Sequence, residues 1–388
     1  MSIKIPLDLL CEGRVKLLLP DGAILGGEAR KVVFYNPLMS FSRDFSICVL
    51  KAYANITGKK DLRVAEPLTA SGVRGIRYAK EVDEVDEVVL SDVNPVAVRI
   101  ARINALLNQV HKKVVVKLSN ANSLLSRHDA KGRRFDFVDI DPFGSPAPYV
   151  DSAIRSTALE GVIALTATDM PPLCGVYPQV ALRRYGGLSL RTEYCHELAV
   201  RLVLGLLCRE AGKHELSIKP LIAHSTRHYI RVFAQLVPSK SSSEAVGLIY
   251  HCRNCLHRRV VKLEDVAPTK SSCENCGSLM EIAGPLWIGS IFDKAFCEEV
   301  ARVANSMDLP NKKELKKVLK LITSEADGPP TFYTVDALSH KYKLKQPKMQ
   351  ELIRKLLSQG FYATPTHFNP KGFRFNGNIA DLIKSLTK

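Results

Sequence analysis

Between residues 61 and 167 the sequence alternates strand-like apolar runs with loops and helix-like segments, and this alternation constrains the fold more than any other feature. The strand-like runs are 62–68, 87–90, 113–118, 135–141 and 161–167. Asn94-Pro95 begins an amphipathic helical pattern that continues through residue 108. Strands separated by helices are typical of a mostly parallel sheet with helices on its faces. We therefore expect an α/β fold, with two further strands at 218–223 and 229–237.

The run from Phe135 to Asp141 ends in a proline and an aromatic residue. Pro142 cannot donate a hydrogen bond to a sheet and so ends the strand. Asp141, the Pro142 carbonyl and the Phe143 ring then stand at the carboxyl end of a strand, where open α/β sheets bind their ligands. A carboxylate and a carbonyl only accept hydrogen bonds, and an aromatic face stacks. This set suits a flat base that carries an exocyclic amino group.

Two further loops indicate a nucleotide-like ligand. Gly72 and Gly75 follow the first strand and let the backbone approach a ligand closely, while Arg74 can reach a carboxylate or phosphate. Asp92 ends the second strand, 92 − 72 = 20 residues after Gly72. Because Rossmann-like folds bind ribose hydroxyls with an acid at this spacing, the pair predicts an adenosine-bearing cofactor. Asn120, after the third strand, either contacts the adenine amino group or is an ordinary polar loop residue.

Four of the ten cysteines form two C-x-x-C pairs, Cys252 with Cys255 and Cys273 with Cys276. The full pattern, C-x2-C-x17-C-x2-C, lies within the spacing of four-cysteine zinc sites. Four thiolates close the tetrahedron around the ion and leave no position for a reacting water, so the predicted Zn²⁺ is structural. The alternative, a pair of redox motifs, lacks a thioredoxin-like βαβ unit around either pair. The scattered remaining cysteines indicate a reducing compartment.

Charge and hydropathy limit the partners. Lysine and arginine outnumber aspartate and glutamate by 55 to 39, a formal charge of +16, which favours a polyanionic partner over a merely basic protein. Segments 335–340, 346–359 and 361–364 resemble a helix-turn-helix with a wing, a unit that binds nucleic acid or serves in packing. No secretory h-region opens the chain and no apolar run is long enough to span a bilayer, so we expect a soluble cytoplasmic protein without membrane contact.

A serine- and lysine-rich linker at 238–244 suggests a domain boundary. We expect one domain over 1–245 and a smaller α+β domain over 246–388 that contains the cysteine pairs (252–276). The first domain opens with a hairpin region. Its expected strands are 12–19 and 31–35, and the expected turn residues between them are Pro20, Asp21, Gly22, Gly26 and Gly27. Between the last two strands, His224, Arg227 and His228 indicate a basic surface in preference to catalytic histidines.

Six motifs together resemble the tRNA (guanine-26 N2)-dimethyltransferase family over nearly the whole chain. They are Phe34-Tyr35-Asn36-Pro37-Leu38-Met39 with Ser42-Arg43-Asp44, Ser71-Gly72-Val73-Arg74-Gly75-Ile76-Arg77, Asp141-Pro142-Phe143-Gly144-Ser145-Pro146, Tyr185-Gly186-Gly187 and Ala283-Gly284-Pro285-Leu286-Trp287. The resemblance implies a Rossmann-like, S-adenosylmethionine-dependent methyltransferase domain and a family-specific C-terminal domain. It also implies mono- and then dimethylation of the N2 amine of guanosine 26 in tRNA, and the zinc pairs are similar to those of archaeal members.

Within this resemblance the site residues carry over motif by motif. Those on the cofactor side are Arg43 and Arg74 at the methionine end, Asp92 at the ribose, and Asn120 and Ala121 in the adenine-side loop. Those on the base side are Asp141 and the Pro142 carbonyl as acceptors for the target amine, with Phe143 and Phe34 as walls. Asn120 stands where the family commonly has an aspartate, and an amide can both donate and accept.

Two other classes of function stay open. An acid-proline-aromatic loop serves any exocyclic amine, so the target could be guanine 10 of tRNA or the N6 of adenine. The chain could also be a non-catalytic nucleic-acid-binding protein whose cofactor fold is vestigial. The sequence leaves open whether the product is mono- or dimethylated and whether a neighbouring tRNA position is modified, and a monomer is favoured.

Overall fold

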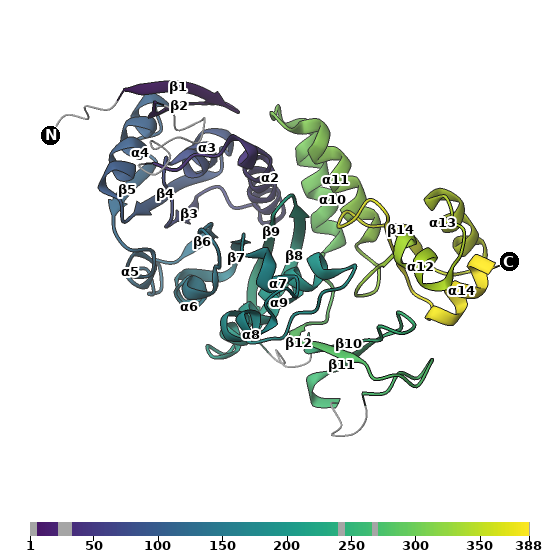
Figure 1. The fold of residues 1–388 in the computed structure, drawn as a ribbon. Coiled ribbons are helices and arrows are strands. Elements are labelled where there is room, and N and C mark those ends of the chain that lie inside the picture. Colours follow the sequence, from purple (N-terminus) through teal and green to yellow (C-terminus); the bar gives the residue numbers. More distant parts are fainter. Residues whose placement is uncertain (1–5, 22–32, 240–244, 266–270, 388) are drawn as a thin grey trace. The chain divides into compact units, whose positions relative to one another are not determined.

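The computed structural model describes residues 6–21, 33–239, 245–265 and 271–387 (Figure 1). The chain divides into two compact units that alternate along the sequence. Unit 1 comprises Met1–Pro142, Pro148–Leu165 and Glu298–Leu319, and unit 2 comprises Phe143–Ala147, Thr166–Cys297 and Lys320–Lys388. The domain boundary expected at residue 245 stays a prediction.

Unit 1 is built on parallel strands that alternate with helices, which confirms the expected α/β class. The strands are β3 (Leu62–Glu66), β4 (Val85–Asp92), β5 (Val114–Leu118), β6 (Phe135–Ile140) and most of β7 (Thr157–Ala167). Their order is β5-β4-β3-β6-β7, and in the largest sheet the order continues with β9 (Tyr229–Pro238) and β8 (Leu216–Thr226). The pairs among the first five strands are parallel, whereas β8 and β9 are antiparallel.

The strand order reverses at β3, which lies between β4 and β6. Parallel strands place their carboxyl ends at one edge of a sheet, and ligands bind where the order reverses. Gly72 lies in the loop after β3, Asp92 is the last residue of β4, and Asp141 directly follows β6. The topology therefore gathers three of the predicted site segments at this edge.

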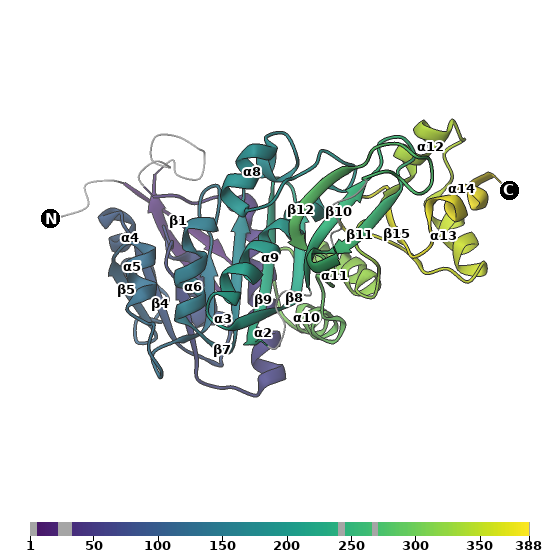
Figure 2. The ribbon, with the colours of Figure 1, turned by 90° about the horizontal axis from the view of Figure 1, so that it is seen from below.

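Helices cover both faces of the parallel strands. In Figures 1 and 2, α2 (Ser40–Thr57), α3 (Val73–Glu81) and α4 (Pro95–Leu107) lie on one side, with α5 (Ala121–Ser126) and α6 (Val150–Ser156) on the other. Local sequence sets the ends of these helices. Asn94 caps α4 by accepting a hydrogen bond from Val96 N at 2.9 Å, and Gly58, with φ +69°, ends α2.

The N-terminal hairpin differs from the expected one. Its strands are β1 (Leu7–Glu12) and β2 (Val15–Pro20), so the strand expected over 12–19 is confirmed over 15–19 and wrong at its start. Gly13, with φ +56°, makes the turn inside that range. Of the second expected strand, residues 31 and 32 lie outside the described residues and 33–35 form no strand. The expected turn residues Gly22, Gly26 and Gly27 also lie outside the described chain.

Two long-range hydrogen-bond sets complete unit 1. On α4, the Asn104 amide bonds both backbone groups of Leu18, accepting from N at 2.7 Å and donating to O at 3.2 Å. Asn104 also donates to the Ser71 carbonyl at 3.0 Å. At the start of α2, Asp44 Oδ2 accepts from Asn311 N at 2.8 Å and from Asn311 Nδ2 at 2.9 Å. Asn311 precedes α11 (Lys312–Glu325), so a late segment of the chain belongs to the unit that the N-terminus begins.

Unit 2 begins its helical part with α7 (Met170–Leu173), α8 (Pro178–Tyr185) and α9 (Cys195–Gly212). A three-stranded antiparallel sheet follows, in the order β11 (Arg258–Lys262), β10 (Val246–His251) and β12 (Glu281–Trp287). Next comes α10 (Lys294–Ser306), which, like α11, runs from one unit into the other.

The C-terminal end has the winged-helix-like form that the sequence predicts. Its helices are α12 (Val335–Tyr342), α13 (Met349–Ser358) and α14 (Ile379–Thr387), beside a small sheet of β13 (Tyr333–Thr334), β15 (Gly372–Phe375) and β14 (Ala363–Pro365). Thr334 caps α12 by accepting from Ala337 N at 3.3 Å. Leu352, Leu356 and Phe373 are in the apolar core of this end.

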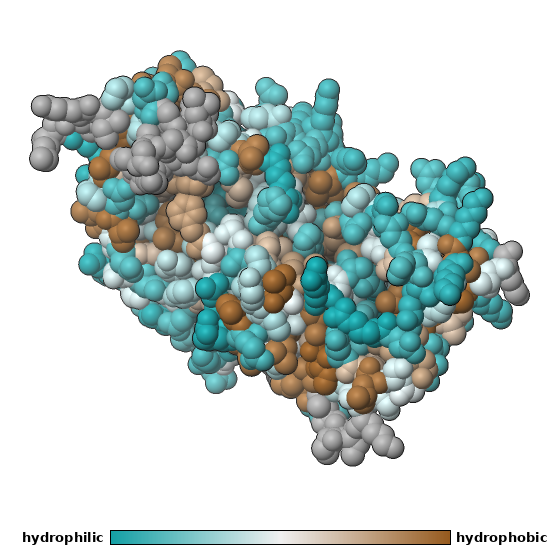
Figure 3. Space-filling model, in the orientation of Figure 1, coloured by the Kyte–Doolittle hydropathy of each residue, from teal (hydrophilic) through white to brown (hydrophobic). Residues whose placement is uncertain are grey.

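Polar side chains cover much of the face drawn in Figure 3, with smaller apolar groups between them. In the part of the chain that the structure describes, every helix is too short or too polar to cross a membrane.

Candidate active site

Asp141 directly follows β6, and the structure pairs it with Arg74 from the first turn of α3. Arg74 Nη2 donates to Asp141 Oδ2, and Arg74 Nη1 donates to Ser46 Oγ at 2.9 Å. Arg74 is buried and Asp141 is half-buried. A charge-assisted bond from a buried arginine fixes the position of a carboxylate better than a contact with water would. The two predicted site residues are therefore brought together, with Asp141 held at the open end of the sheet.

Two more carboxylates, which sequence reasoning did not assign to the site, lie behind this pair. Arg74 Nε is 3.7 Å from Asp139 Oδ2 and 3.9 Å from Glu66 Oε1. Asp139 also accepts from the Tyr78 hydroxyl at 2.5 Å. Glu66 is the last residue of β3, Asp139 is the last but one of β6, and both are buried. A carboxylate in a buried strand needs a polar partner, and that was the available signal.

The charge balance of this cluster shifts two pKa values. Burial raises the pKa of Glu66 to about 8, although Arg74 opposes the shift. Burial lowers the pKa of Arg74, but Asp141 and Asp139 raise it by more, so the net shift is well upward. Arg74 is therefore a permanent cation, whereas Glu66 is mostly protonated at neutral pH.

The loop between β3 and α3 has the form expected of a cofactor-binding loop. Gly72 has φ +81°, and a Cβ there would lie 3.0 Å from the Ala101 Cβ, so the close passage against α4 requires glycine. The Ser71 hydroxyl is buried and has no hydrogen-bond partner among the described residues. An unsatisfied buried hydroxyl beside a glycine turn is consistent with a polar ligand group at this position.

Asp92, at the end of β4, fixes the backbone of the two adjacent loops. Its two carboxylate oxygens accept from Ala70 N and Asn94 N, each at 2.9 Å. Ala70 has φ +46°, in the left-handed region, as is common at ligand-binding turns. Asp92 remains half-buried, and a carboxylate oxygen can accept more than one hydrogen bond, so it can still bind ribose hydroxyls. The loop and the acid together fit an adenosine-bearing cofactor.

The residues that the sequence predicts on the adenine side lie at the start of α5. The Asn120 side chain caps this helix by accepting from Asn122 N at 2.9 Å and from Ser123 N at 3.4 Å. Ala121 is the first residue of the helix and is buried. Because the Asn120 oxygen is occupied by the cap, its amide nitrogen is the group left for a ligand.

Arg43 lies in the first turn of α2 and contacts the N-terminal hairpin. Its Nε donates to Glu12 Oε1 at 2.6 Å, its Nη2 donates to Glu12 Oε2, and Nη2 also donates to the Asn36 carbonyl at 3.1 Å. Burial raises the pKa of Glu12, but Arg43 and Arg77 lower it by more, to about 2. Sequence reasoning missed Glu12, because its partners are 31 and 65 residues away along the chain.

The two aromatic residues assigned to the base pocket differ in exposure. Phe34 is half-buried in unit 1, whereas the Phe143 side chain in unit 2 is 76% exposed. Pro142, between Asp141 and Phe143, is buried. The loop after Phe143 is fixed within unit 2, because Gly144 N donates to Thr168 Oγ1 at 2.8 Å and Thr168 N donates to the Gly144 carbonyl at 2.9 Å. An exposed aromatic ring on a fixed loop can stack on a flat ligand.

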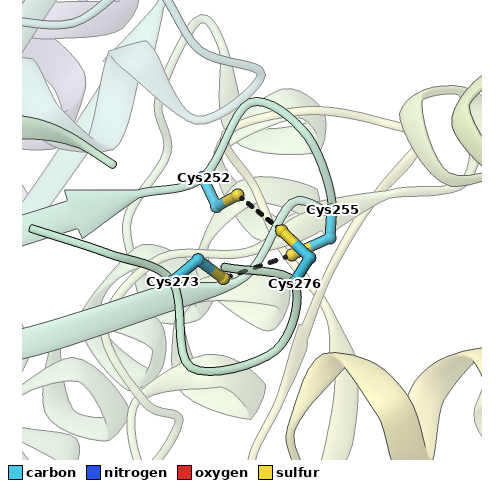
Figure 4. Close-up of side chains that lie close together, drawn as sticks. All are labelled: Cys252, Cys255, Cys273 and Cys276. Atoms are coloured by element: carbon cyan, nitrogen blue, oxygen red, sulfur yellow. Dashed lines mark hydrogen bonds between the residues drawn. The ribbon is translucent and has the colours of Figure 1, made fainter. Parts of the chain in front are cut away.

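The four predicted zinc ligands converge at the ends of the β10–β12 sheet (Figure 4). The Sγ atoms of Cys252 and Cys276 are 3.5 Å apart, as are those of Cys255 and Cys273. Bond lengths in a tetrahedral Zn–S₄ site place the sulfurs about 3.8 Å apart. The residues therefore fit a structural Zn²⁺. The Tyr342 hydroxyl donates to the Cys255 carbonyl at 2.8 Å. The zinc knuckle formed by Cys252 and Cys255 therefore contacts the winged-helix-like C-terminal end.

The strand order, the glycine loop before α3 and the acid that ends β4 define the class: a Rossmann-like, S-adenosylmethionine-dependent methyltransferase. Residues 13–387 match the family described as N2,N2-dimethylguanosine tRNA methyltransferase, and the chain belongs to this family.

Relatives and a solved structure agree over nearly the full length. The chain is 37% identical to the tRNA (guanine(26)-N(2))-dimethyltransferase of Methanosphaera stadtmanae, over 96% of this chain and 94% of that protein. It is 36% identical to the enzyme of the same name from Methanocaldococcus jannaschii, over 97% of this chain and 98% of that protein. The solved complex of Trm1 from Pyrococcus horikoshii with S-adenosyl-L-methionine is similar with a TM-score of 0.86, at 31% identity, over 98% of this chain and 99% of that one.

Proposed function

We propose that this protein transfers methyl groups from S-adenosylmethionine to the exocyclic N2 amine of guanosine 26 in tRNA. The product is N2-methylguanosine and then N2,N2-dimethylguanosine. The observation that carries the proposal is the Asp141 carboxylate, held by buried Arg74 at the open end of the sheet in a chain of this family.

The proposed chemistry explains why acceptors stand at this position. The N2 lone pair of guanine is delocalised into the ring and is a poor nucleophile. Acceptors for its two hydrogens, Asp141 and the Pro142 carbonyl, favour a pyramidal nitrogen whose lone pair is free to attack. The bound cofactor supplies a methyl group already activated by its sulfonium.

Asp141 has a second role as positive charge develops on nitrogen. A fixed carboxylate stabilises that charge electrostatically and can accept the proton that leaves. Its ion pair with Arg74 fixes the carboxylate at this edge of the sheet. After the first transfer one hydrogen remains, and the base must rotate to present it. The target base has to leave its stack to reach this edge, and we assign its stacking partners as Phe34 and Phe143.

On the cofactor side we propose Arg74 and Arg43 at the methionine end, Asp92 at the ribose, and Asn120 with Ala121 at the adenine. Arg43 is retained because it shares α2 with Ser46, the residue that contacts Arg74. The unsatisfied Ser71 hydroxyl adds a polar group in the same loop.

We assign tRNA binding to residues 246–388, where the zinc knuckles and the winged end lie, and methyl transfer to 1–245. The net charge of +16 supports a polyanionic substrate. A structural Zn²⁺ on Cys252, Cys255, Cys273 and Cys276 would hold the knuckle that Tyr342 contacts. We propose a cytoplasmic monomer.

The deciding experiment is methyl transfer to unmodified tRNA with the modified nucleotide mapped by mass spectrometry. We expect Asp141→Ala to lower turnover by about 10³-fold or more, because an interaction made only in the transition state is lost. Cofactor affinity from isothermal titration should change little. Near-normal turnover of this variant would remove Asp141 from the mechanism.

A matched control variant and the position of the methylated nucleotide distinguish the proposed function from its alternatives. Asp151→Asn changes an exposed aspartate on α6 and should leave turnover unchanged. Methylation at guanine 10 or at an adenine would replace the assigned target. Absence of S-adenosylmethionine binding by the wild-type chain would favour the non-catalytic alternative.

A further inference from the structure

A second group of metal-ligand side chains lies in unit 2, apart from the four cysteines and without a role in the proposed methyl transfer. It consists of Cys174, Cys195 and His196, each half-buried. Their sulfur and imidazole ligand atoms all lie within 4.8 Å of one another. Cys174 follows α7 and Cys195 begins α9, so the group joins two points that are 21 residues apart (195 − 174 = 21).

Contacts within the protein already hold these two points together. The buried Ser189 hydroxyl donates to the Pro172 carbonyl at 2.6 Å, just before the two ligand positions. Gly175 has φ +84°, and a Cβ there would lie 2.2 Å from both Arg191 N and the Leu190 carbonyl carbon. The backbone after Cys174 therefore passes against the segment that leads into Cys195, at a distance that only glycine permits.

The chemistry of the three side chains selects the ion. Two thiolates and one imidazole form a soft, nitrogen-containing set that prefers Zn²⁺ to Mg²⁺ or Ca²⁺. Ligand atoms around tetrahedral zinc stand about 3.4–3.8 Å apart, so separations below 4.8 Å need only small side-chain rotations to converge. Three protein ligands leave one position for water.

We propose that Cys174, Cys195 and His196 bind a second Zn²⁺. The ion would link the two ends of the segment 175–194, which contains α8. That segment supplies the Tyr185 hydroxyl and the Arg184 guanidinium, which donate to Asp169 at 2.5 and 2.8 Å. Asp169 directly follows Thr168, the residue after β7 that bonds the Phe143 loop at Gly144. The second ion would stabilise the segment 175–194 of unit 2.

The test is the metal content of the full-length protein, purified with reductant, loaded with Zn²⁺ and freed of excess by gel filtration. We expect the wild type to hold about two zinc ions per chain, and Cys195→Ser and Cys252→Ser about one each. The double variant should hold close to none. Co²⁺ replacement should give two sets of thiolate charge-transfer bands, one of which is lost in Cys195→Ser.

Two further variants keep the outcome interpretable. His196→Gln is a milder change that should also lose about one zinc ion if Cys195→Ser disturbs folding. Cys208→Ser removes a buried thiol from the same helix, outside both groups, and should keep about two. A wild type with one zinc ion, unchanged by Cys195→Ser, would overturn the proposal. So would alkylation mass spectrometry that finds Cys174 and Cys195 joined in a disulfide. Neither outcome depends on methyl transfer.

Discussion

Arg74 is a buried cation that faces three carboxylates, from Glu66, Asp139 and Asp141. One positive charge beside three carboxylates, two of them buried, favours the protonated form of one acid. Glu66 is that acid, because burial raises its pKa to about 8. The arrangement leaves Asp141, at the open end of the cluster, as the acid that faces the substrate.

The raised pKa of Glu66 makes stability depend on pH. An unfolded glutamate loses its proton near its ordinary pKa of 4.5 and the folded one near 8, so the folded state binds the extra proton between these values. The free energy of unfolding should therefore fall through this window, by up to about 1.4 kcal/mol per pH unit from this group. Glu66→Gln removes the titrating group, so its stability relative to the wild type should rise from pH 5 to pH 8 in urea unfolding.

A control of opposite sign sharpens this prediction. Burial raises the pKa of Glu84, but Lys51 lowers it by more, so the net shift is downward and that glutamate stabilises the fold in its ionised form. Glu84→Gln should not gain stability with rising pH. Parallel pH profiles for the wild type and Glu66→Gln would contradict the assignment of the proton to Glu66.

Sequence reasoning assigned residues at strand ends to the candidate site, together with Arg74, and missed other residues that contact them. Asp92 and Asp141 were recognisable because each follows an apolar run, which is a local signal. Glu66 and Asp139 looked like ordinary strand residues, and their importance depends on Arg74, which no local pattern places beside them. The contacts of Arg43 with Glu12 were also unpredictable, because two residues 31 apart meet only after the hairpin docks.

At the scale of elements, Asn104 on α4 and Asn108, which caps the end of that helix, fix the backbone of β2. Asn104 bonds Leu18, and Asn108 bonds Lys16 by accepting from its N at 2.8 Å and donating to its O at 2.6 Å. Side-chain amides thus pair backbone groups of β2. The hairpin is fixed to a helix that also supports the glycine loop.

Asn104→Ala should lower the free energy of unfolding by about 2–3 kcal/mol, because it strands buried donors and acceptors on Leu18. It should also weaken S-adenosylmethionine binding several-fold, since Asn104 donates to the Ser71 carbonyl in the cofactor loop. Urea unfolding and isothermal titration would measure the two effects. Asn108→Ala is the matched control: it should lose stability through Lys16 and keep the cofactor affinity. Equal affinity losses in both variants would contradict the link to Ser71.

Element positions were mostly predictable because hydrophobic period and helix caps are local signals. Strand β6 ends one residue before the predicted position, and helix α4 matches the predicted range within one residue. The failure at residues 12–19 has an equally local cause. Gly13 interrupts an apolar run that reads as one strand, and only the left-handed φ of that glycine shows a turn.

At the scale of the whole molecule, the net charge of +16 sets the expected mode of tRNA binding. Affinity should fall steeply with salt, by about tenfold or more between 50 and 200 mM, as bound counterions are released. Arg354→Ala, on the exposed surface of α13, should reduce the slope of log affinity against log salt by about one. Lys112→Ala, an exposed change in unit 1, should leave the slope unchanged. A flat salt response of the wild type would remove the basic surface from tRNA binding.

The Asn311–Asp44 contact has a consequence for how the chain folds during synthesis. Its partners are 267 residues apart, so at roughly 5–20 residues per second the ribosome needs on the order of ten seconds or more between them. Until then the buried carboxylate of Asp44 lacks two of its hydrogen-bond donors. Unit 1, which begins at the N-terminus, can therefore be completed only after the segment that contains Asn311 has been synthesised.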